Sequence, residues 1–392
     1  LTNLLESCND WINSLQEGKC VDVIYFDIKK AFDTVSHVKL LHKCQAYGIQ
    51  GRLLLYLDAF LHNRRQRVVN EGKSSGWRPV CSGVPQGSVL GPLLFLIYVN
   101  DAPNSAISCV VKLFADDTKL YNGYLPSIAC NDMQNDFNFY YTWCNEWQLD
   151  IHPGKCSVLQ LGNFARLGTS YTIEDVEIAV CDVVRDLGVM MSSNLRFSDH
   201  CALVSTKASR ICGMILRAFS SRDSDFMVKV FVVYVRPVLE YCCEVWSPSY
   251  LSDIERVESV QRSFTRRIAG LSGYSYRQRL SLCNLESLEL RRLKKDLVLV
   301  YRMFKRLCPL SFTDFFANAH YSSTRGHSMK LYPRKGHTDR ALSSFAHRVV
   351  NVWNILPQTV VESTSLCLFK SRLDSQTDRL LPWLRGRAYK DV

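Results

Sequence analysis

The chain has 392 residues, of which 47% are hydrophobic and 22% are charged, and its formal net charge is +11. This length and composition suit two or three packed domains, and no long low-complexity tract interrupts them. The 16 cysteines are scattered without a Cys-x-x-Cys pair, which argues against zinc ribbons and disulfide scaffolds and favours reduced thiols in an intracellular protein. The strongest apolar run, 89–99, is too short to cross a bilayer, so we expect no membrane association.

The charge is uneven along the chain. Residues 1–200 hold 17 Lys and Arg against 21 Asp and Glu, whereas residues 201–392 hold 31 against 16. A basic half of this kind suits contact with a phosphate backbone. The alternative is a group of ordinary helices with a solvated basic face, and the charge count alone does not separate the two.

The first half of the chain alternates between helical and strand patterns. In chain order we expect a helix at 1–15, a strand at 21–27, helices at 38–47 and 52–61, a short hairpin at 66–70 and 76–80, a buried helix at 89–99, a hairpin at 109–120, a helix at 126–147 and strands at 156–161, 170–173, 176–180 and 184–190. This order predicts an α+β fold in which helices pack on one face of an antiparallel sheet.

The second half is mainly helical in pattern. We expect helices at 203–219, 225–240, 253–269, 288–307, 341–356 and 366–373. The aromatic residues of the helix at 126–147 are interpreted as core residues rather than as a surface for stacking bases.

Three aspartates stand in two of the predicted strands. Asp27 follows Val-Ile-Tyr-Phe at 23–26, and Asp116 and Asp117 lie in the apolar stretch 112–120. A carboxylate among buried strand residues is costly unless something pairs it. Hard oxygen ligands suit Mg²⁺, and two such ions about 3.5–4 Å apart can serve a phosphoryl displacement. The spacing favours a nucleotidyl transferase, and the alternative is a set of buried, salt-bridged acids.

Three short motifs follow one another along the chain. They read Phe-Asp-Ile-Lys-Lys-Ala-Phe-Asp at 26–33, Gly-Val-Pro-Gln-Gly-Ser-Val-Leu-Gly-Pro at 83–92 and Phe-Ala-Asp-Asp at 114–117. In this order they resemble the reverse transcriptases of non-LTR (LINE-type) retrotransposons, and the combination is far more specific than any one motif. The stretches at 234–241 and 246–248 resemble the same family, so that the similarity covers nearly the whole chain.

The resemblance implies an architecture and an activity. It predicts a polymerase palm at 1–193, a helical thumb at 194–272 and a basic, mostly helical extension at 273–392. It also implies RNA-directed DNA synthesis with an RNA template, a DNA primer and deoxynucleoside triphosphates as partners, in the nucleus or the cytoplasm. Two Mg²⁺ ions, or Mn²⁺ in their place, would be bound by Asp27 and Asp116, with Asp117 as a less direct ligand.

Other site residues follow from the same resemblance. Phe32 corresponds to the aromatic residue that excludes a 2′-hydroxyl, and Gln86 and Gly87 correspond to contacts with the template and the nucleotide. Lys155 corresponds to a candidate acid for the pyrophosphate leaving group. The alternatives are a core phenylalanine, a solvated glutamine and a surface lysine. Asp33 is expected to cap a helix rather than to bind metal.

Three interpretations of the chain remain open. The basic fingers strands that precede the first motif in the family have no counterpart before Asp27, where Lys19 is the one basic residue. We therefore expect an N-terminally truncated enzyme with weak primer extension by itself. The rival interpretation is an inactive or domesticated fragment that binds nucleic acid through its basic half. An RNA-dependent RNA polymerase is the third, and Phe32 together with Phe-Ala-Asp-Asp argues against it.

Overall fold

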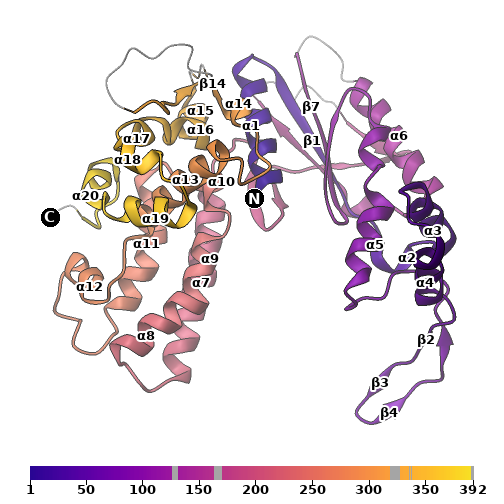
Figure 1. The fold of residues 1–392 in the computed structure, drawn as a ribbon, viewed down its shortest axis with the longest axis horizontal. Helices are drawn as coiled ribbons and strands as arrows, with labels where there is room; N and C mark the ends of the chain where they lie inside the picture. The colour runs from indigo at the N-terminus through magenta and orange to yellow at the C-terminus, as the bar shows by residue number, and fades with distance from the viewer. Residues whose placement is uncertain (126–130, 163–169, 318–326, 335, 337, 390–392) are drawn as a thin grey trace. The chain divides into compact units, whose positions relative to one another are not determined.

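The computed structural model describes residues 1–125, 131–162, 170–317, 327–334, 336 and 338–389. The chain forms two compact units (Figure 1). We call Gly18–Asp182 the sheet unit, and we call Leu1–Glu17 together with Val183–Val392 the helical unit.

The sheet unit is built on five strands in the order β11-β8-β1-β7-β6. Their bounds are β1 Cys20–Phe26, β6 Val110–Phe114, β7 Asp117–Tyr124, β8 Ser157–Leu161 and β11 Ala179–Val180. The central strand β1 is antiparallel to both β7 and β8, and β6 is antiparallel to β7. The short strand β11 is parallel to β8. The sheet is therefore antiparallel except at one edge.

Helices of the sheet unit cover one face of this sheet. They are α2 Ala31–Thr34, α3 His37–Ala46, α4 Gly51–Leu61, α5 Leu90–Val99, α6 Asn131–Glu146, and the 3₁₀ turns η1 Ala102–Ser105 and η2 Pro153–Lys155. Alternate residues of β1 point to the same face, and the ring of Phe26 lies 5.2 Å from Phe137 and 5.0 Å from Tyr140 of α6. Both α6 rings are buried, which confirms their interpretation as core residues.

Two further ribbons belong to the sheet unit. One is formed by β2 Arg65–Gln66, β3 Val69–Asn70, β4 Lys73–Ser74 and β5 Arg78–Pro79, and the other by β9 Thr172–Ile173 and β10 Val176–Glu177. The predicted α+β class and the predicted hairpins at 66–80 and 109–120 are confirmed. The predicted helix at 126–147 is α6, and the first five residues of that prediction lie outside the described residues.

The helical unit contains α1, one β-hairpin and the helices of the second half. Its elements are α1 Thr2–Gln16, β12 Val183–Asp186, β13 Val189–Ser192, α7 Ser198–Ala218, α8 Ser224–Val230, the π-helical η3 Phe231–Val235, α9 Arg236–Glu240, α10 Cys243–Trp246, α11 Leu251–Thr265, α12 Tyr276–Leu282, α13 Leu288–Phe304, α14 Phe312–Phe315, β14 Phe316–Ala317, β15 Tyr332–Pro333, α15 Asp339–Ser343, α16 Phe345–Arg348, α17 Val350–Asn354, α18 Gln358–Val361, α19 Leu366–Asp374, α20 Thr377–Leu380 and η4 Leu381–Trp383. The helix predicted at 225–240 is continuous through η3, where a π turn precedes Pro237 and accommodates a residue that has no backbone N–H.

Helix α13 is the centre of the helical unit. Its Asp296 is 2% exposed and accepts two hydrogen bonds, of 2.8 and 2.9 Å, from the guanidinium of Arg348 on α16. Its Tyr301 ring stacks on Phe369 of α19 at 4.3 Å. The carboxylate of Glu258 on α11 accepts the first backbone N–H groups of α13, the position where an acid stabilises a helix.

The two compact units do not coincide with the three predicted domains. Residues 1–17 and 183–193 belong to the helical unit rather than to the expected palm. The predicted border at residue 272 runs between α11 and α13, which Glu258 joins, and both lie in one unit. The division into palm, thumb and extension therefore stays a prediction.

Two further properties concern the described residues only. None of their helices is both long and apolar enough to cross a membrane. Ten of the fifteen described cysteines are buried. Burial raises the pKa of several of them, including Cys212 to about 12, so these thiols stay protonated at neutral pH.

His200 is a buried, uncharged side chain near the start of α7. It is 2% exposed, its Nδ1 accepts a hydrogen bond of 3.3 Å from the backbone N–H of Met190, and its ring meets Trp246 edge-on at 4.9 Å. Burial lowers the pKa of His200 to about 4, and the positive charge of Arg185 makes a smaller contribution in the same direction. The histidine therefore has a structural role.

Acid should destabilise the helical unit through this residue. The unfolded chain protonates the imidazole near its ordinary pKa of 6.5, whereas the folded chain does so only near 4. The contribution of His200 to stability is thus complete above pH 6.5 and is lost as the pH falls toward 4. We expect His200→Gln to reduce the difference in unfolding free energy between pH 7 and pH 4.5 by about 2 kcal/mol. Chemical denaturation at both pH values measures this, and equal differences in the two proteins would contradict it.

Candidate active site

Asp27 lies at the end of the central strand of the sheet. The last pair of the β1–β7 ladder joins Phe26 to Thr118, so Asp27 follows this pair on β1 and Asp117 precedes it on β7. Directly opposite residues of antiparallel strands have Cα atoms about 4.5–5.5 Å apart. The register therefore brings the end of β1 next to the turn between β6 and β7.

That turn carries the other two acids. Phe114 pairs with Asp117, which leaves Ala115 and Asp116 as a two-residue connection between β6 and β7. Ala115 has a φ of +56°, the left-handed conformation that two-residue hairpin loops use. The Asp pair thus lies at the bend of the hairpin predicted at 109–120.

The three carboxylates are not buried, which corrects the premise that they are costly groups inside strands. The side chain of Asp27 is 39% exposed, Asp116 is half-buried and Asp117 is exposed. Each acid emerges where a strand ends. Within the described residues, no group of three or more His, Cys, Asp and Glu side chains is arranged to hold a metal ion. The strand register thus brings the backbone of the three acids close together, but their side chains are not arranged around a common metal position.

A positive group lies beside Asp27. Lys155 Nζ is 3.1 Å from Asp27 Oδ2, and both side chains are partly exposed. Such an exposed ion pair contributes little to stability. Carboxylate oxygens are the donors that Mg²⁺ prefers. The three acids are therefore of the right chemical type for a divalent cation but are not arranged around one point, and the ammonium of Lys155 lies beside the carboxylate of Asp27.

The backbone around Asp27 is held from its second side as well. The backbone N–H of His152 donates to the Asp27 carbonyl at 2.8 Å, and that of Lys29 donates to the Asp150 carbonyl at 2.7 Å. Ile28 and Ile151 form an isolated antiparallel bridge. These bonds fix the segment that leads into η2, which carries Lys155. His152, whose carbonyl accepts from the Lys155 N–H, thus links the backbone of Asp27 to the turn that carries Lys155.

Phe32 lies on the short helix α2 that follows β1. Its half-buried ring stacks on Phe95 of α5, with ring centroids 4.4 Å apart and an interplanar angle of 17°. The stack fixes the orientation of the ring. The structure thus shows a rigidly held aromatic side chain, and its role toward a sugar stays a prediction.

The loop that contains Gln86 and Gly87 is tied to α2. The Val84 N–H donates to the Phe32 carbonyl, and the Gly83 N–H donates to the Val35 carbonyl, both at 2.8 Å. Gly83 is buried with φ +88°, and a Cβ there would lie 2.8 Å from the backbone of Asp33. Only glycine allows this approach.

Asp33 does not cap a helix, contrary to expectation. It lies inside α2, whose N-cap position is Lys30, and its Oδ1 accepts a hydrogen bond of 3.0 Å from Gln86 Nε2. The exposed Gln86 is therefore positioned by Asp33, while the exposed Gly87 has φ +82° and open space around it. No local sequence pattern indicates this pair, because the two residues are 53 positions apart and only the contact between the loop and α2 joins them.

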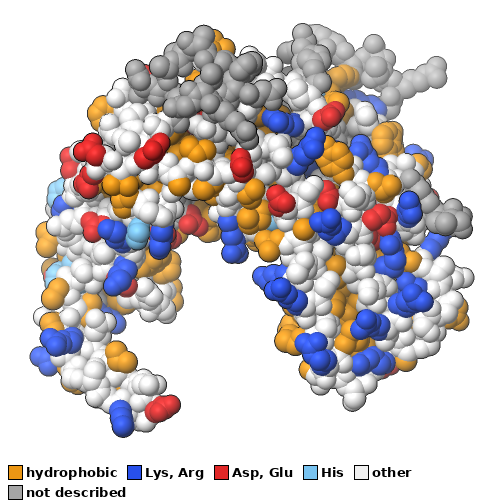
Figure 2. Space-filling view, turned by 180° about the vertical axis from the view of Figure 1, so that it is seen from behind, with side chains coloured by type: hydrophobic (Ala, Val, Ile, Leu, Met, Phe, Trp, Pro, Cys, Tyr) orange, Lys and Arg blue, Asp and Glu red, His pale blue; other side chains and the backbone are white. Residues whose placement is uncertain are grey.

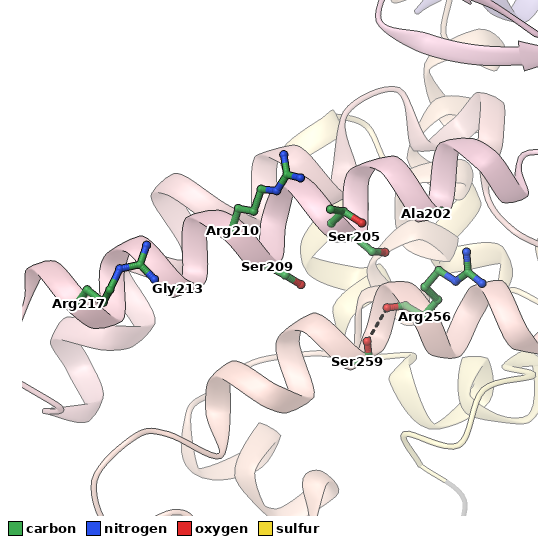
Figure 3. Close-up of a pocket in the computed structure, with 9 residues that line it drawn as sticks. Ala202, Ser205, Ser209, Arg210, Gly213, Arg217, Arg256 and Ser259 are labelled. Atoms are coloured by element: carbon green, nitrogen blue, oxygen red, sulfur yellow. Dashed lines mark hydrogen bonds between the residues drawn. The ribbon is translucent and has the colours of Figure 1, made fainter.

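The helical unit carries a basic groove between α7 and α11 (Figure 3). Its volume is about 600 Å³, and hydroxyl groups and three arginines line it. The lining residues are Ala202, Ser205, Thr206, Ser209, Arg210, Gly213, Arg217, Arg256 and Ser259. The hydroxyl of Ser205 is buried and has no hydrogen-bond partner among the described residues. In Figure 2, Lys and Arg side chains are spread over the part of this unit that contains α7, α8, α11 and α12.

The affinity of nucleic acid for this groove should fall as the salt concentration rises. Each phosphate contact that is lost lowers the slope of log affinity against log salt by about 0.7–0.9. We expect Arg210→Gln to reduce the slope by about this amount, measured by fluorescence anisotropy with a labelled RNA oligonucleotide. Lys207→Gln is the matched control, because Lys207 is exposed on the same helix and does not line the groove. Equal slopes for Arg210→Gln and the unmodified chain would contradict the assignment.

Comparison with known proteins agrees with these motifs. Residues 3–189 match the family model described as reverse transcriptase (RNA-dependent DNA polymerase). The RNA-directed DNA polymerase from the mobile element jockey of Drosophila funebris is 27% identical over 67% of this chain and 30% of its own length. The probable RNA-directed DNA polymerase from the transposon X-element of Drosophila melanogaster is 28% identical over 63% of this chain and 28% of its own length.

A structural comparison gives a weaker likeness. Apo telomerase from Candida tropicalis covers 74% of this chain with a TM-score of 0.42 and 10% identity, and half of that chain is matched. The chain spans about 30% of the length of the two Drosophila relatives. The matched motifs at 26–33, 83–92 and 114–117 all fall within the region of the family model. Residues 3–189 therefore match the reverse transcriptase family, and the two relatives are RNA-directed DNA polymerases of mobile elements.

Proposed function

We propose that the chain catalyses RNA-templated addition of deoxynucleotides to a primer 3′-hydroxyl. The observation that carries the proposal is the β1–β7 register, which sets Asp27 beside the turn of Asp116 and Asp117. Three acids at one end of two neighbouring strands, with Lys155 beside Asp27, suit phosphoryl transfer better than a structural role does. The fold alone would not support a catalytic function, because one fold can have many functions.

Each residue has a distinct part in the proposal. Asp27 and Asp116 would hold two Mg²⁺ ions with the support of Asp117, and bound Mg²⁺, or Mn²⁺, would make the primer hydroxyl more acidic and offset the charge of the triphosphate. Lys155, now paired with Asp27, would donate a proton to the departing pyrophosphate. Catalysis would depend on positioning as well as on charge, as in other phosphoryl transfers.

The loop at 83–87 would form the nucleotide side of the site. Gln86 is held by Asp33 and would contact the template or the incoming nucleotide, and Gly87 would let the backbone approach it. Phe32 would lie beneath the sugar and exclude a 2′-hydroxyl. The rival role of an inactive nucleic-acid-binding fragment is not favoured, because all of these residues are kept together with the motifs that carry them.

Loss of one carboxylate should abolish DNA synthesis. We expect Asp116→Asn to lower RNA-templated primer extension with Mg²⁺ by at least about 100-fold, since the charge that would hold the cation is removed. Extension by the unmodified chain, if slow, is compared under single-turnover conditions with excess protein. Asp132→Asn is the control, because it removes an exposed carboxylate of the same unit, on α6. Equal activity of Asp116→Asn and the unmodified chain would refute the proposal.

The size of the side chain at position 32 should set sugar discrimination. We expect Phe32→Ala to raise the incorporation of ribonucleotides relative to deoxynucleotides by about 10-fold or more, because the ring would no longer meet the 2′-hydroxyl. Phe32→Tyr, which keeps the ring and its stack on Phe95, should discriminate as before. The ratio of kcat/KM for the two substrates is the measurement. A variant that loses stability but not discrimination would assign Phe32 to packing alone.

A further inference from the structure

The ribbon formed by β2 to β5, residues 63–79, extends from the sheet unit and is exposed along its whole length. Every residue from 63 to 79 is exposed to solvent, and in Figure 1 the ribbon projects beyond α4. The Val80 N–H donates to the Arg64 carbonyl at 3.0 Å and closes its base. At its tip, Glu71 and Gly72 both have positive φ, the geometry of a two-residue hairpin turn. From base to tip the strands span about 20 Å.

The charge of the ribbon is one-sided. It carries five basic residues and one acid, Glu71. The basic residues are Arg64, Arg65, Arg67, Lys73 and Arg78. A solvated hairpin that only needs solubility is better served by a mixture of both signs. Five cations on an exposed ribbon instead form a binding surface for a polyanion.

An aromatic residue lies among these cations. The register pairs Arg65 with Pro79 and Gln66 with Arg78, so that Arg67 and Trp77 share a face with Arg65, whereas Arg78 lies on the other face. The guanidinium of Arg67 is 4.7 Å from the centre of the Trp77 ring, and Trp77 remains 57% exposed. One face of the ribbon therefore combines two guanidiniums with an exposed indole.

This combination selects the kind of partner. Sequence-tolerant binding of single strands combines basic side chains that follow the backbone with aromatic side chains on which unpaired bases stack. A base within a duplex cannot reach such a ring. The base of the ribbon is also close in the chain to the candidate nucleotide loop, where the hydroxyl of Ser82 donates to the Asp33 carbonyl at 2.9 Å. A nucleic-acid strand bound to the ribbon would thus be bound by a segment that continues directly into that loop.

We propose that this face of the ribbon binds the single-stranded RNA template, with a base stacked on Trp77 and phosphates at Arg65 and Arg67. The proposal rests on the proposed function for the identity of the strand, and it adds a template-binding surface outside the residues of the catalytic motifs. It requires no rearrangement of the core, because the whole ribbon is solvent-exposed.

The test measures binding of an unstructured, labelled RNA of about 20 nucleotides to the full chain by fluorescence anisotropy at fixed salt. We expect Trp77→Ala to weaken binding by about 5- to 100-fold and Trp77→Phe to retain most of the affinity, because base stacking needs a ring. Arg67→Gln should weaken binding more than Arg78→Gln, which removes the same charge from the opposite face. All of these side chains are exposed, and circular dichroism verifies that each variant folds.

Binding requires no catalysis, so the same series is run in the Asp116→Asn chain. Unchanged affinity of Trp77→Ala, or equal effects of Arg67→Gln and Arg78→Gln, would overturn the proposal. A double-stranded DNA that binds as tightly as the RNA, with the same dependence on Trp77, would also overturn it in favour of a duplex-binding ribbon. Failure of primer extension with a retained Trp77 effect would refute the polymerase activity and leave the RNA-binding face in place.

Discussion

The pairing of β1 with β7 on one side and β8 on the other is the constraint on which the site depends. β1 is the central strand, and its seven residues from Cys20 to Phe26 are all paired with β7. A shift of one residue would turn Ile24 and Phe26 away from the core beneath α6. The same shift would move Asp27 away from the Asp116–Asp117 turn. The packing of the apolar face and the position of the acids are thus fixed together, and the core enforces the geometry of the site.

A second constraint joins the two motifs that the sequence separates by about 50 residues. The loop at 83–87 approaches α2 so closely that position 83 admits no Cβ. The hydrogen bonds of Val84 and Gly83 then fix the loop, and Gln86 reaches Asp33. Neither motif would have this shape alone. Functional residues on loops are precise only where a scaffold holds them, and here the scaffold is the backbone contact between the two motifs.

Local patterns in the sequence predicted the elements well and their long-range partners poorly. The apolar run at 21–27 and the helical spacing of 38–61 predict β1, α3 and α4 to within one or two residues. By contrast, the pairing of Arg348 with Asp296 and the place of α1 in the helical unit depend on contacts between distant segments, which no local period reports. The expectation that the three acids lie near one another is consistent with the strand register. The expectation that they lie within buried strands is wrong, because they lie at strand ends. Their role as metal ligands stays a prediction.

The number of charged residues in each half of the sequence did not fully predict where the basic surfaces lie. It indicated the second half as the nucleic-acid-binding half, and the groove of Arg210 and Arg256 lies there. The first half carries a net negative charge, yet it contains a basic element that is exposed along its whole length, the ribbon at 63–79. Three of its acids are buried and do not reach the surface. Asp22 is 0% exposed, Asp186 is 6% exposed, and Asp136 is 2% exposed and accepts backbone N–H groups of 107–109. A binding partner contacts only the charges at the surface. The net charge of one half of the sequence therefore does not predict the charge of the surface that binds.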